Sequence, residues 1–410
     1  MASKLLFFSC LLYRIRKNPF SFNAHPKELG FDLMDRIPAD TTLCKGAYQS
    51  DATPALKFGY RPELDGLRGI SILLVYIHHL YYPLMPGGFF GVDVFFVLSG
   101  FLITSLLVQE QERKGSISLR DFYIRRALRL MPALLTFILV IGGFALIFLD
   151  TIRRAAAFHG ILMALSYASN WFIASGYFTP NNPLGITWSL AIEEQFYLTW
   201  PLSLSLALRY KLGRRWFFYI LALAIVIIPM HRKVLAVYGA NVMRLYYASD
   251  TRADTLLIGC LMGLLVSWHV LPHYKGFEIS MKSLAALAFV FLGYMVSTAS
   301  PVDRMLYLYG GYTLVALSIG LILIVLVVWP PKVVLSILRF APLVWIGRIS
   351  YGLYLWHWPV RLFVYSRYGL PASVGELLIG VGLSLSMATL SYYFVEKSFL
   401  RWKKSFSFNK

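Results

Sequence analysis

The sequence predicts an all-α polytopic membrane protein with about ten transmembrane helices, and three observations carry this prediction. Of 410 residues, 58% are hydrophobic and only 14% are charged, whereas a soluble domain carries about a quarter charged residues. Apolar runs near 20 residues long, enough to cross a bilayer, recur along most of the chain. The net charge of +19 indicates basic loops at the cytoplasmic face rather than nucleic-acid binding.

The chain divides into three parts. Residues 1–57 are of mixed polarity, and their one apolar run, LLFFSCLLY, is too short to span. We expect a disordered cytoplasmic extension there, with Met34 as an alternative start of the native protein. Residues 58–397 form the predicted transmembrane domain, and residues 398–410 form a basic cytoplasmic tail. The scattered cysteines predict neither a disulfide framework nor a metal site: Cys10, Cys44 and Cys260.

The transmembrane domain contains ten apolar segments of spanning length. An eleventh segment, 155–175, is less apolar and amphipathic, which predicts an interfacial or re-entrant helix. The spans are expected near 67–84, 90–108, 131–149, 186–208, 216–231, 252–271, 280–299, 305–328, 346–366 and 373–395.

The loops determine the predicted orientation. Lys and Arg gather in 109–130, in 209–215 and in the tail, whereas the turn 82–89 has none. With ten spans these basic segments lie on the side of the N-terminus, which makes both termini cytoplasmic. Four basic residues run against this assignment without outweighing it: Arg153, Arg154, Arg232 and Lys233.

The first span places two ionisable side chains on one helix face. Arg68 and His79 are eleven residues apart, close to three full turns and about 16 Å along the axis. Asp65 and Ser71 extend the same stripe, whereas His78 faces elsewhere and is predicted to be structural or interfacial. An intramembrane ionisable residue usually faces a cavity or the bundle interior, and histidine suits general-base chemistry. From spacing alone, a catalytic His79 and a structural hydrogen-bonding His79 are evenly balanced.

Six motifs in order carry a family resemblance: YRPELDGLRGISILLVYIHH with PGGFFGVDVFFVLSGFLIT, then FYIRRALRLMP, WSLAIEEQFYLTWP, RADTLLIGCLMG and GRISYGLYLWHWPV. From about Tyr60 to Lys397 the chain strongly resembles the acyltransferase-3 family, integral membrane acyltransferases that acylate bacterial surface sugars. The resemblance implies a multi-pass protein of the bacterial inner membrane. The family's opening motif, arginine, ten residues, then histidine, matches Arg68 and His79 but not His78.

The same resemblance assigns roles to other motifs. Arginine guanidinium groups bind phosphates through paired hydrogen bonds. Arg125, Arg126 and Arg129 would therefore bind the phosphates of coenzyme A at the cytoplasmic entry of the third span. Any cytoplasmic loop is basic, and only the family's Arg-x-x-Arg pattern, Arg126 with Arg129, favours binding over that simpler explanation. The family's WSL-x-x-Glu pattern selects Glu193 over Glu194.

Three further positions have open assignments. Asp93 opens the second span and could orient the imidazole of His79 as a carboxylate does in a triad, or it could cap the helix. Asp254 and Arg252 could form a buried ion pair. His357 lies between two tryptophans, a pattern that fits an aromatic belt or a kink before Pro359 at least as well as catalysis.

The resemblance implies transfer of an acyl group, most often acetyl, from cytoplasmic acyl-CoA to a hydroxyl of a lipid-linked or extracellular glycan. His79 would act as the base or become acylated and relay the group outward. No permanently bound cofactor and no metal are expected. The alternative is a transporter or flippase for an anionic glycolipid or metabolite, which the missing inverted repeat weakens. A scaffold would leave the buried charges unexplained.

Overall fold

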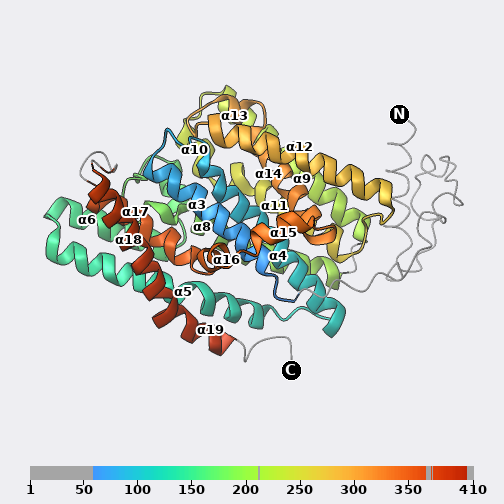
Figure 1. Cartoon of the computed structure of the whole chain (residues 1–410), viewed down its shortest axis with the longest axis horizontal. Helices are drawn as coiled ribbons and strands as arrows, with labels where there is room; N and C mark the ends of the chain where they lie inside the picture. Colours follow the sequence, from blue (N-terminus) through green and yellow to red (C-terminus); the bar gives the residue numbers. More distant parts are fainter. Residues whose placement is uncertain (1–58, 211–212, 366–370, 372, 404–410) are drawn as a thin grey trace, which may run out of the picture.

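The computed structural model describes residues 59–210, 213–365, 371 and 373–403, and every regular element in these ranges is helical. Figure 1 shows the long helices packed side by side in one bundle. Each of the ten predicted spans coincides with one long helix over most of its length, which confirms the all-α prediction, although 305–328 also contains the short helix α13 (Met305–Leu308) and 346–366 begins in α16 (Ala341–Arg348). The ten long helices are α3 (Pro62–Leu80), α4 (Gly91–Lys114), α5 (Leu119–Phe148), α8 (Trp188–Arg209), α9 (Arg214–Val237), α11 (Ser249–Ser267), α12 (Lys275–Thr298), α14 (Gly311–Val328), α17 (Ser350–Val364) and α18 (Val374–Leu390).

Shorter elements connect the long helices. The predicted interfacial segment 155–175 is two helices, α6 and α7, because the chain turns at Tyr167, whose φ is 51°. The expected extension 1–57 lies outside the described residues, and the start of the tail is helical in α19. The short elements are η2 (Gly88–Phe90), α6 (Thr151–Leu165), α7 (Ser169–Ala174), η3 (Gly185–Thr187), α10 (Val242–Tyr247), α13 (Met305–Leu308), α15 (Lys332–Leu338), α16 (Ala341–Arg348), η4 (Ser391–Glu396) and α19 (Lys397–Lys403).

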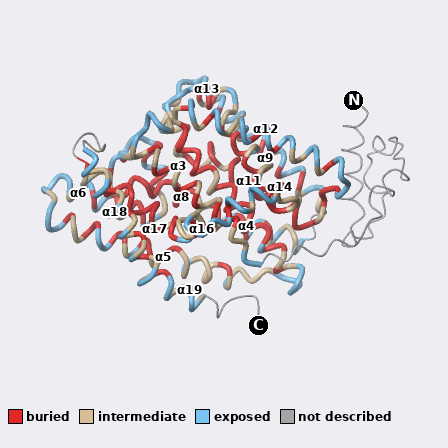
Figure 2. Tube along the Cα trace, in the orientation of Figure 1, coloured by how far each residue is buried: buried red, intermediate tan, exposed pale blue. Residues whose placement is uncertain are grey.

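Six helical segments in the described ranges are long and apolar enough to cross a membrane. The other four predicted spans, α3, α8, α11 and α17, are either shorter or more polar. Figure 2 shows buried residues concentrated along these four helices near the centre of the bundle. Central helices can be polar because they face protein, whereas lipid-facing helices cannot. The spans that meet the criterion are 88–114, 119–148, 214–237, 275–298, 311–328 and 374–402.

Glycines let the central helices approach closely, as small residues do between membrane helices. A Cβ on Gly100 of α4 would lie 2.1 Å from the carbonyl oxygen of Leu256 in α11. At the other crossing, a Cβ on Gly347 of α16 would lie 1.8 Å from the carbonyl oxygen of Asp65 in α3. These contacts hold α3, α4, α11 and α16 at fixed positions around the cavities described below.

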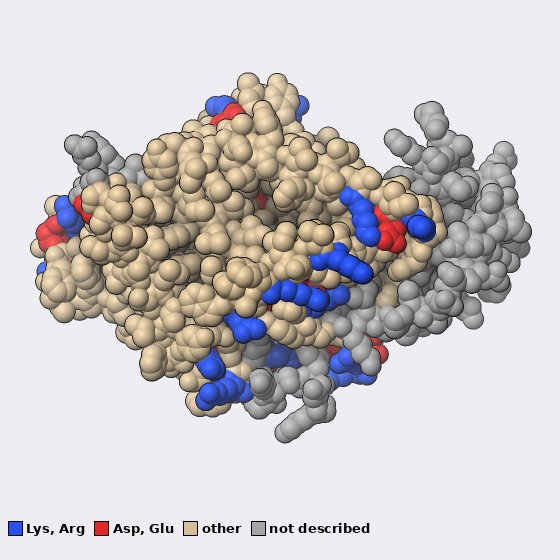
Figure 3. Space-filling model, in the orientation of Figure 1, with Lys and Arg blue, Asp and Glu red and all other residues tan. Residues whose placement is uncertain are grey.

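Charged side chains are unevenly distributed on the surface. In Figure 3, Lys and Arg gather at the lower right of the face shown, and a broad area without charge separates them from the few charged groups near α13 at the top. An uncharged area of this width, seen on one face, is the kind of surface that a bilayer requires of a multi-helix protein.

Candidate active site

A basic cavity lies where α3 begins. Its volume is about 480 Å³. Arg68 of α3 and Arg126 and Arg129 of α5 line it, together with Asp65 and Glu396. Asp65 lies 3.9 Å from the Arg68 guanidinium. Among the described residues, Arg126 and Arg129 have no ion-pair partner, so this cavity favours an anionic ligand.

A middle cavity of about 80 Å³ lies next to the basic cavity. The two spaces share Arg68, Arg126 and Arg129, and the middle cavity adds Glu193 of α8. Ser99 of α4 donates a hydrogen bond of 2.7 Å to Glu193 Oε1 and accepts one of 3.0 Å from the Tyr197 hydroxyl. The remaining wall is mostly apolar: Val92, Phe95, Phe96, Leu130 and Leu190.

An outer cavity of about 150 Å³ lies at the other end of α3 and contains His79 in its wall. No Lys, Arg, Asp or Glu of the described chain lines it. Six aromatic side chains line it: Phe89, Trp188, Tyr246, Tyr247, Tyr354 and Trp358.

Consecutive turns of the same helices line all three cavities. On α4, Val92 borders the outer and middle cavities, and Ser99 borders the middle and basic cavities. On α17, Tyr351 and Tyr354 make the same two junctions. The three cavities therefore lie in a row along the bundle, from the arginines to His79.

Arg68 and His79 stand at opposite ends of this row, about 16 Å apart by helical rise, as their spacing predicts. Ser71 departs from the predicted stripe. It is fully buried, and its Oγ donates to the carbonyl oxygen of Leu67 in its own helix. His78 is buried, and its Nδ1 lies 3.2 Å from the carbonyl oxygen of Met85, so it ties the turn after α3 to the helix.

His357 of α17 is the functional candidate that sequence reasoning missed. Its Nε2 lies 2.9 Å from His79 Nδ1, and the two rings stack with their planes at 24°. The available signal was helical spacing: Ser350, Tyr354 and His357 follow at intervals of four and three residues, which places them on one face. The tryptophans on either side of His357 indicated an aromatic belt or a helix kink instead.

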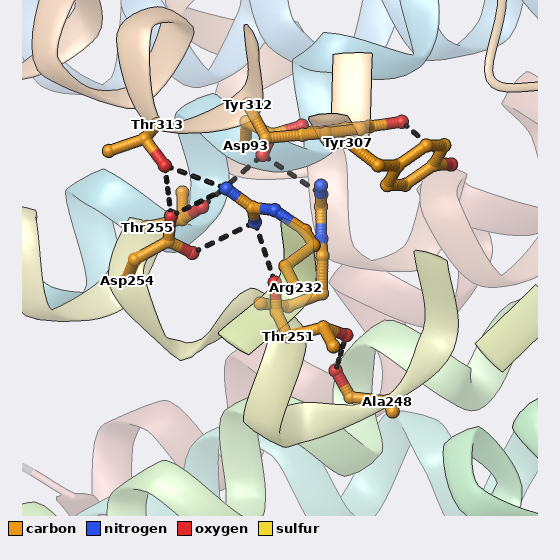
Figure 4. A network of polar contacts seen from close by, with 10 residues as sticks. Asp93, Arg232, Ala248, Thr251, Asp254, Thr255, Tyr307, Tyr312 and Thr313 are labelled. Atoms are coloured by element: carbon orange, nitrogen blue, oxygen red, sulfur yellow. Dashed lines mark hydrogen bonds and ion pairs between the residues drawn. The ribbon is translucent and has the colours of Figure 1, made fainter. Parts of the chain in front are cut away.

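Asp93 is not the partner of His79, which corrects the expectation that it orients the imidazole. Its carboxylate accepts a hydrogen bond of 2.9 Å from Arg252. Asp254 is likewise paired with Arg232 at 3.0 Å and not with Arg252, contrary to the predicted pair. Figure 4 shows these buried charges beside Thr313, Thr255 and the tyrosines at 307 and 312. The sequence predicted that Arg252 and Asp254 are buried charges of α11 but could not identify their partners on other helices.

The three predicted phosphate-binding arginines separate. Arg125 forms a 3.3 Å ion pair with the fully buried Glu110 of α4, and it is absent from the cavity walls. Arg126 and Arg129 line the basic and middle cavities, and the Arg126 guanidinium lies 3.6 Å from the centre of the Tyr197 ring. Arg125 therefore fastens α5 to α4, while its neighbours face the open space.

This arrangement can bind an anion at one end and exchange a proton or an acyl group at the other. The described residues contain no group of three or more His, Cys, Asp or Glu side chains able to hold a metal ion.

Comparison with known proteins places this geometry in context. Residues 61–396 match the acyltransferase-3 family, described as an acyltransferase domain. The chain is 37% identical over 373 residues to a protein of Staphylococcus aureus strain MRSA252 named "Putative O-acetyltransferase SAR0937", covering 85% of this chain and 60% of that one. It is 33% identical over 349 residues to the peptidoglycan O-acetyltransferase OatA of Listeria monocytogenes, covering 82% and 55%.

The O-acetyltransferase OatA of Staphylococcus aureus strain NCTC 8325 is 35% identical over 351 residues, covering 82% of this chain and 57% of that protein. The chain thus spans somewhat over half the length of the curated relatives it matches. No solved structure matches it.

Proposed function

The chain belongs to the acyltransferase-3 family, and from that premise we propose that it moves an acetyl group from acyl-CoA to a glycan hydroxyl. The observation that carries the proposal is a row of three cavities with shared wall residues, from an arginine-lined cavity to His79. A carrier would also need an anion site, but the family of transferases and the small middle cavity favour group transfer.

The donor enters at the basic cavity, which we place at the cytoplasmic face because the basic loops around it follow the positive-inside rule. Guanidinium groups bind phosphates bidentately, and Arg126 and Arg129 have no carboxylate partner among the described residues. The phosphates of coenzyme A stay at these arginines, while the uncharged pantetheine arm extends through the middle cavity. The separation of about 16 Å between Arg68 and His79 is comparable to the length of that arm.

The reaction takes place beside His79. The acceptor oxygen attacks the thioester carbonyl carbon while the imidazole takes the hydroxyl proton. The carbon–sulfur bond then breaks, and the leaving thiolate of coenzyme A receives that proton. In the relay version the imidazole nitrogen attacks the thioester carbonyl carbon, the carbon–sulfur bond breaks and the thiolate of coenzyme A leaves. The acceptor hydroxyl then attacks the acyl carbon on His79, the carbon–nitrogen bond breaks, and the hydroxyl proton ends on the thiolate. In both versions the imidazole ends the cycle unchanged.

The acceptor enters the outer cavity, which we place at the extracytoplasmic side. Its aromatic, uncharged wall offers flat apolar surfaces beside the imidazole, a setting suited to the faces of sugar rings. The Listeria relative is named for peptidoglycan, which makes a cell-wall glycan the first acceptor to test here.

The test compares His79→Ala with His159→Ala, a matched change at an exposed histidine of α6 that lines none of the three cavities. Each full chain is expressed in a host whose own cell-wall acetylation has been deleted. Ester-linked acetate released from purified wall by mild alkali is measured by mass spectrometry. We expect His159→Ala to transfer acetate and His79→Ala to transfer none. Full transfer by well-folded His79→Ala would refute the role of His79, and no acetate with the unmodified chain would refute a wall acceptor.

A further inference from the structure

His357 is a second buried imidazole at the proposed reaction centre. Its Nε2 contacts His79 Nδ1 at 2.9 Å. Its own Nδ1 lies 3.1 Å from the carbonyl oxygen of Leu353, one turn earlier in α17. The side chain is 1% exposed, and the rings of Tyr76 and Tyr354 pack against it. The imidazole is therefore held by two directional contacts and has little freedom to rotate.

These two contacts determine where the protons lie. A backbone carbonyl can only accept, so the contact with Leu353 requires a proton on Nδ1 of His357. A neutral His357 then carries its lone pair on Nε2. The contact between the two rings consequently requires His79 to donate from Nδ1. The lone pair of a neutral His79 is thereby left on Nε2.

The surroundings favour neutral rings. The ionisable side chains that act on the two imidazoles are His78 and Arg361 besides the rings themselves, and none of these is a carboxylate. A positive charge buried without a counter-ion is costly. A cationic His357 would also donate from Nε2, which would force His79 to accept at Nδ1 and would put its proton on the wrong nitrogen.

We propose that His357 is a positioning residue that fixes the tautomer and ring plane of His79, so that Nε2 of His79 is the atom that accepts the hydroxyl proton. This inference rests on the proposed function. A neutral imidazole takes the place that a carboxylate occupies in a hydrolytic triad. It orients the base without adding a charge beside the uncharged outer cavity.

The test uses two amides that differ by one methylene. In His357→Gln the side-chain carbonyl oxygen reaches the former place of Nε2 and can accept from His79. In His357→Asn the amide reaches only the former place of Nδ1, so the bond to Leu353 survives and the acceptor is lost. Isolated membranes bearing the full chain are assayed with radiolabelled acetyl-CoA and purified cell-wall glycan, and kcat and KM for acetyl-CoA are determined.

We expect His357→Asn to lower kcat by about 10- to 100-fold, the usual cost of removing a group that orients a functional histidine. We expect His357→Gln to recover most of the activity. The KM for acetyl-CoA should not change in either variant, because His357 lines none of the three cavities. Elution on gel filtration and stabilisation by added coenzyme A report whether each variant is folded.

Equal kcat values for folded Gln and Asn variants would overturn the proposal, because only the Gln side chain is expected to accept the hydrogen bond from His79. A side chain that merely fills space would give the two variants similar kcat values. A folded Gln variant as inactive as Asn would overturn it as well. Activity in His79→Ala would instead overturn the proposed function, which separates that failure from the failure of the His357 assignment.

Discussion

The buried pair of Asp93 and Arg252 gives the sharpest stability prediction. Both side chains are fully buried, and one hydrogen bond of 2.9 Å joins them. Asp93→Asn keeps the shape of the side chain but leaves the Arg252 charge without its partner. Breaking a buried pair on one side costs about 3–5 kcal/mol, which corresponds to a loss of about 10²- to 4 × 10³-fold in the ratio of folded to unfolded protein.

The double variant Asp93→Leu/Arg252→Met should behave differently. In the described structure, Asp93 Oδ2 and Arg252 Nε and Nη1 have no hydrogen-bond partner, so the pair is incompletely compensated. Replacing both charges by apolar groups of similar size is often neutral or stabilising. We therefore expect the double variant to be more stable than Asp93→Asn, with a favourable coupling energy between the two sites.

Equilibrium unfolding of the purified chain in mixed micelles, followed by tryptophan fluorescence, measures these free energies. Glu278→Gln is the control, because its ion pair with Lys282 is partly exposed on α12 and should contribute at most about 1 kcal/mol. If Asp93→Asn lowers the free energy of unfolding by no more than Glu278→Gln does, the reasoning is refuted. A double variant that is stable yet transfers no acetate would show that Asp93 takes part in the chemistry and does not only hold α4 against α11.

Three further predictions follow from other contacts. Gly347→Ala should abolish folded protein, because its Cβ would lie 1.8 Å from the Asp65 carbonyl oxygen, whereas Gly143→Ala meets nothing within 4 Å and should fold; the yield of monodisperse protein checks this. Arg129→Ala should raise the KM for acetyl-CoA more than it lowers kcat, since each bond to a charged group contributes about 1.5–3 kcal/mol, and equal KM values would contradict its place at the phosphates. Glu193→Gln keeps the shape of the acceptor of the Ser99 hydrogen bond but removes its charge, and we expect weaker transfer with unchanged yield of folded protein; unaltered transfer would limit Glu193 to packing.

The sequence predicts where the helices lie and which residues share a helix face better than it predicts which helices and side chains contact one another. The apolar segments locate all ten long helices, and the spacing of Arg68 and His79 places them at two ends of one row of cavities. The periodicity of a sequence, however, shows only which residues share one face of a helix. It does not show which residues of other helices that face contacts. His357 is 278 positions from His79 and Arg252 is 159 positions from Asp93, so these partners emerge only when the helices pack.

The polar central helices also explain why a count of transmembrane helices based on length and hydropathy misses some of the long helices. Six segments satisfy length and hydropathy together, while α3 and α8 bring Arg68 and Glu193 to the cavities. A helix surrounded by protein can carry such groups at low cost, because their partners are other side chains and the interior of a cavity. Some of the helices that build the site, α3 and α8 among them, therefore fail the membrane criterion, whereas α4 and α5 satisfy it and line the cavities as well.

The narrow middle cavity has a consequence for the cell as well as for the reaction. A passage from one membrane face to the other would dissipate the proton gradient if it conducted hydrated ions. Between its polar edges, the middle cavity is only about 80 Å³ and has Val92, Phe95 and Phe96 in its wall. Constrictions of this kind exclude water and block conduction by dewetting. If the proposed function holds, the middle cavity would admit a slender, uncharged thioester arm while the membrane remains sealed.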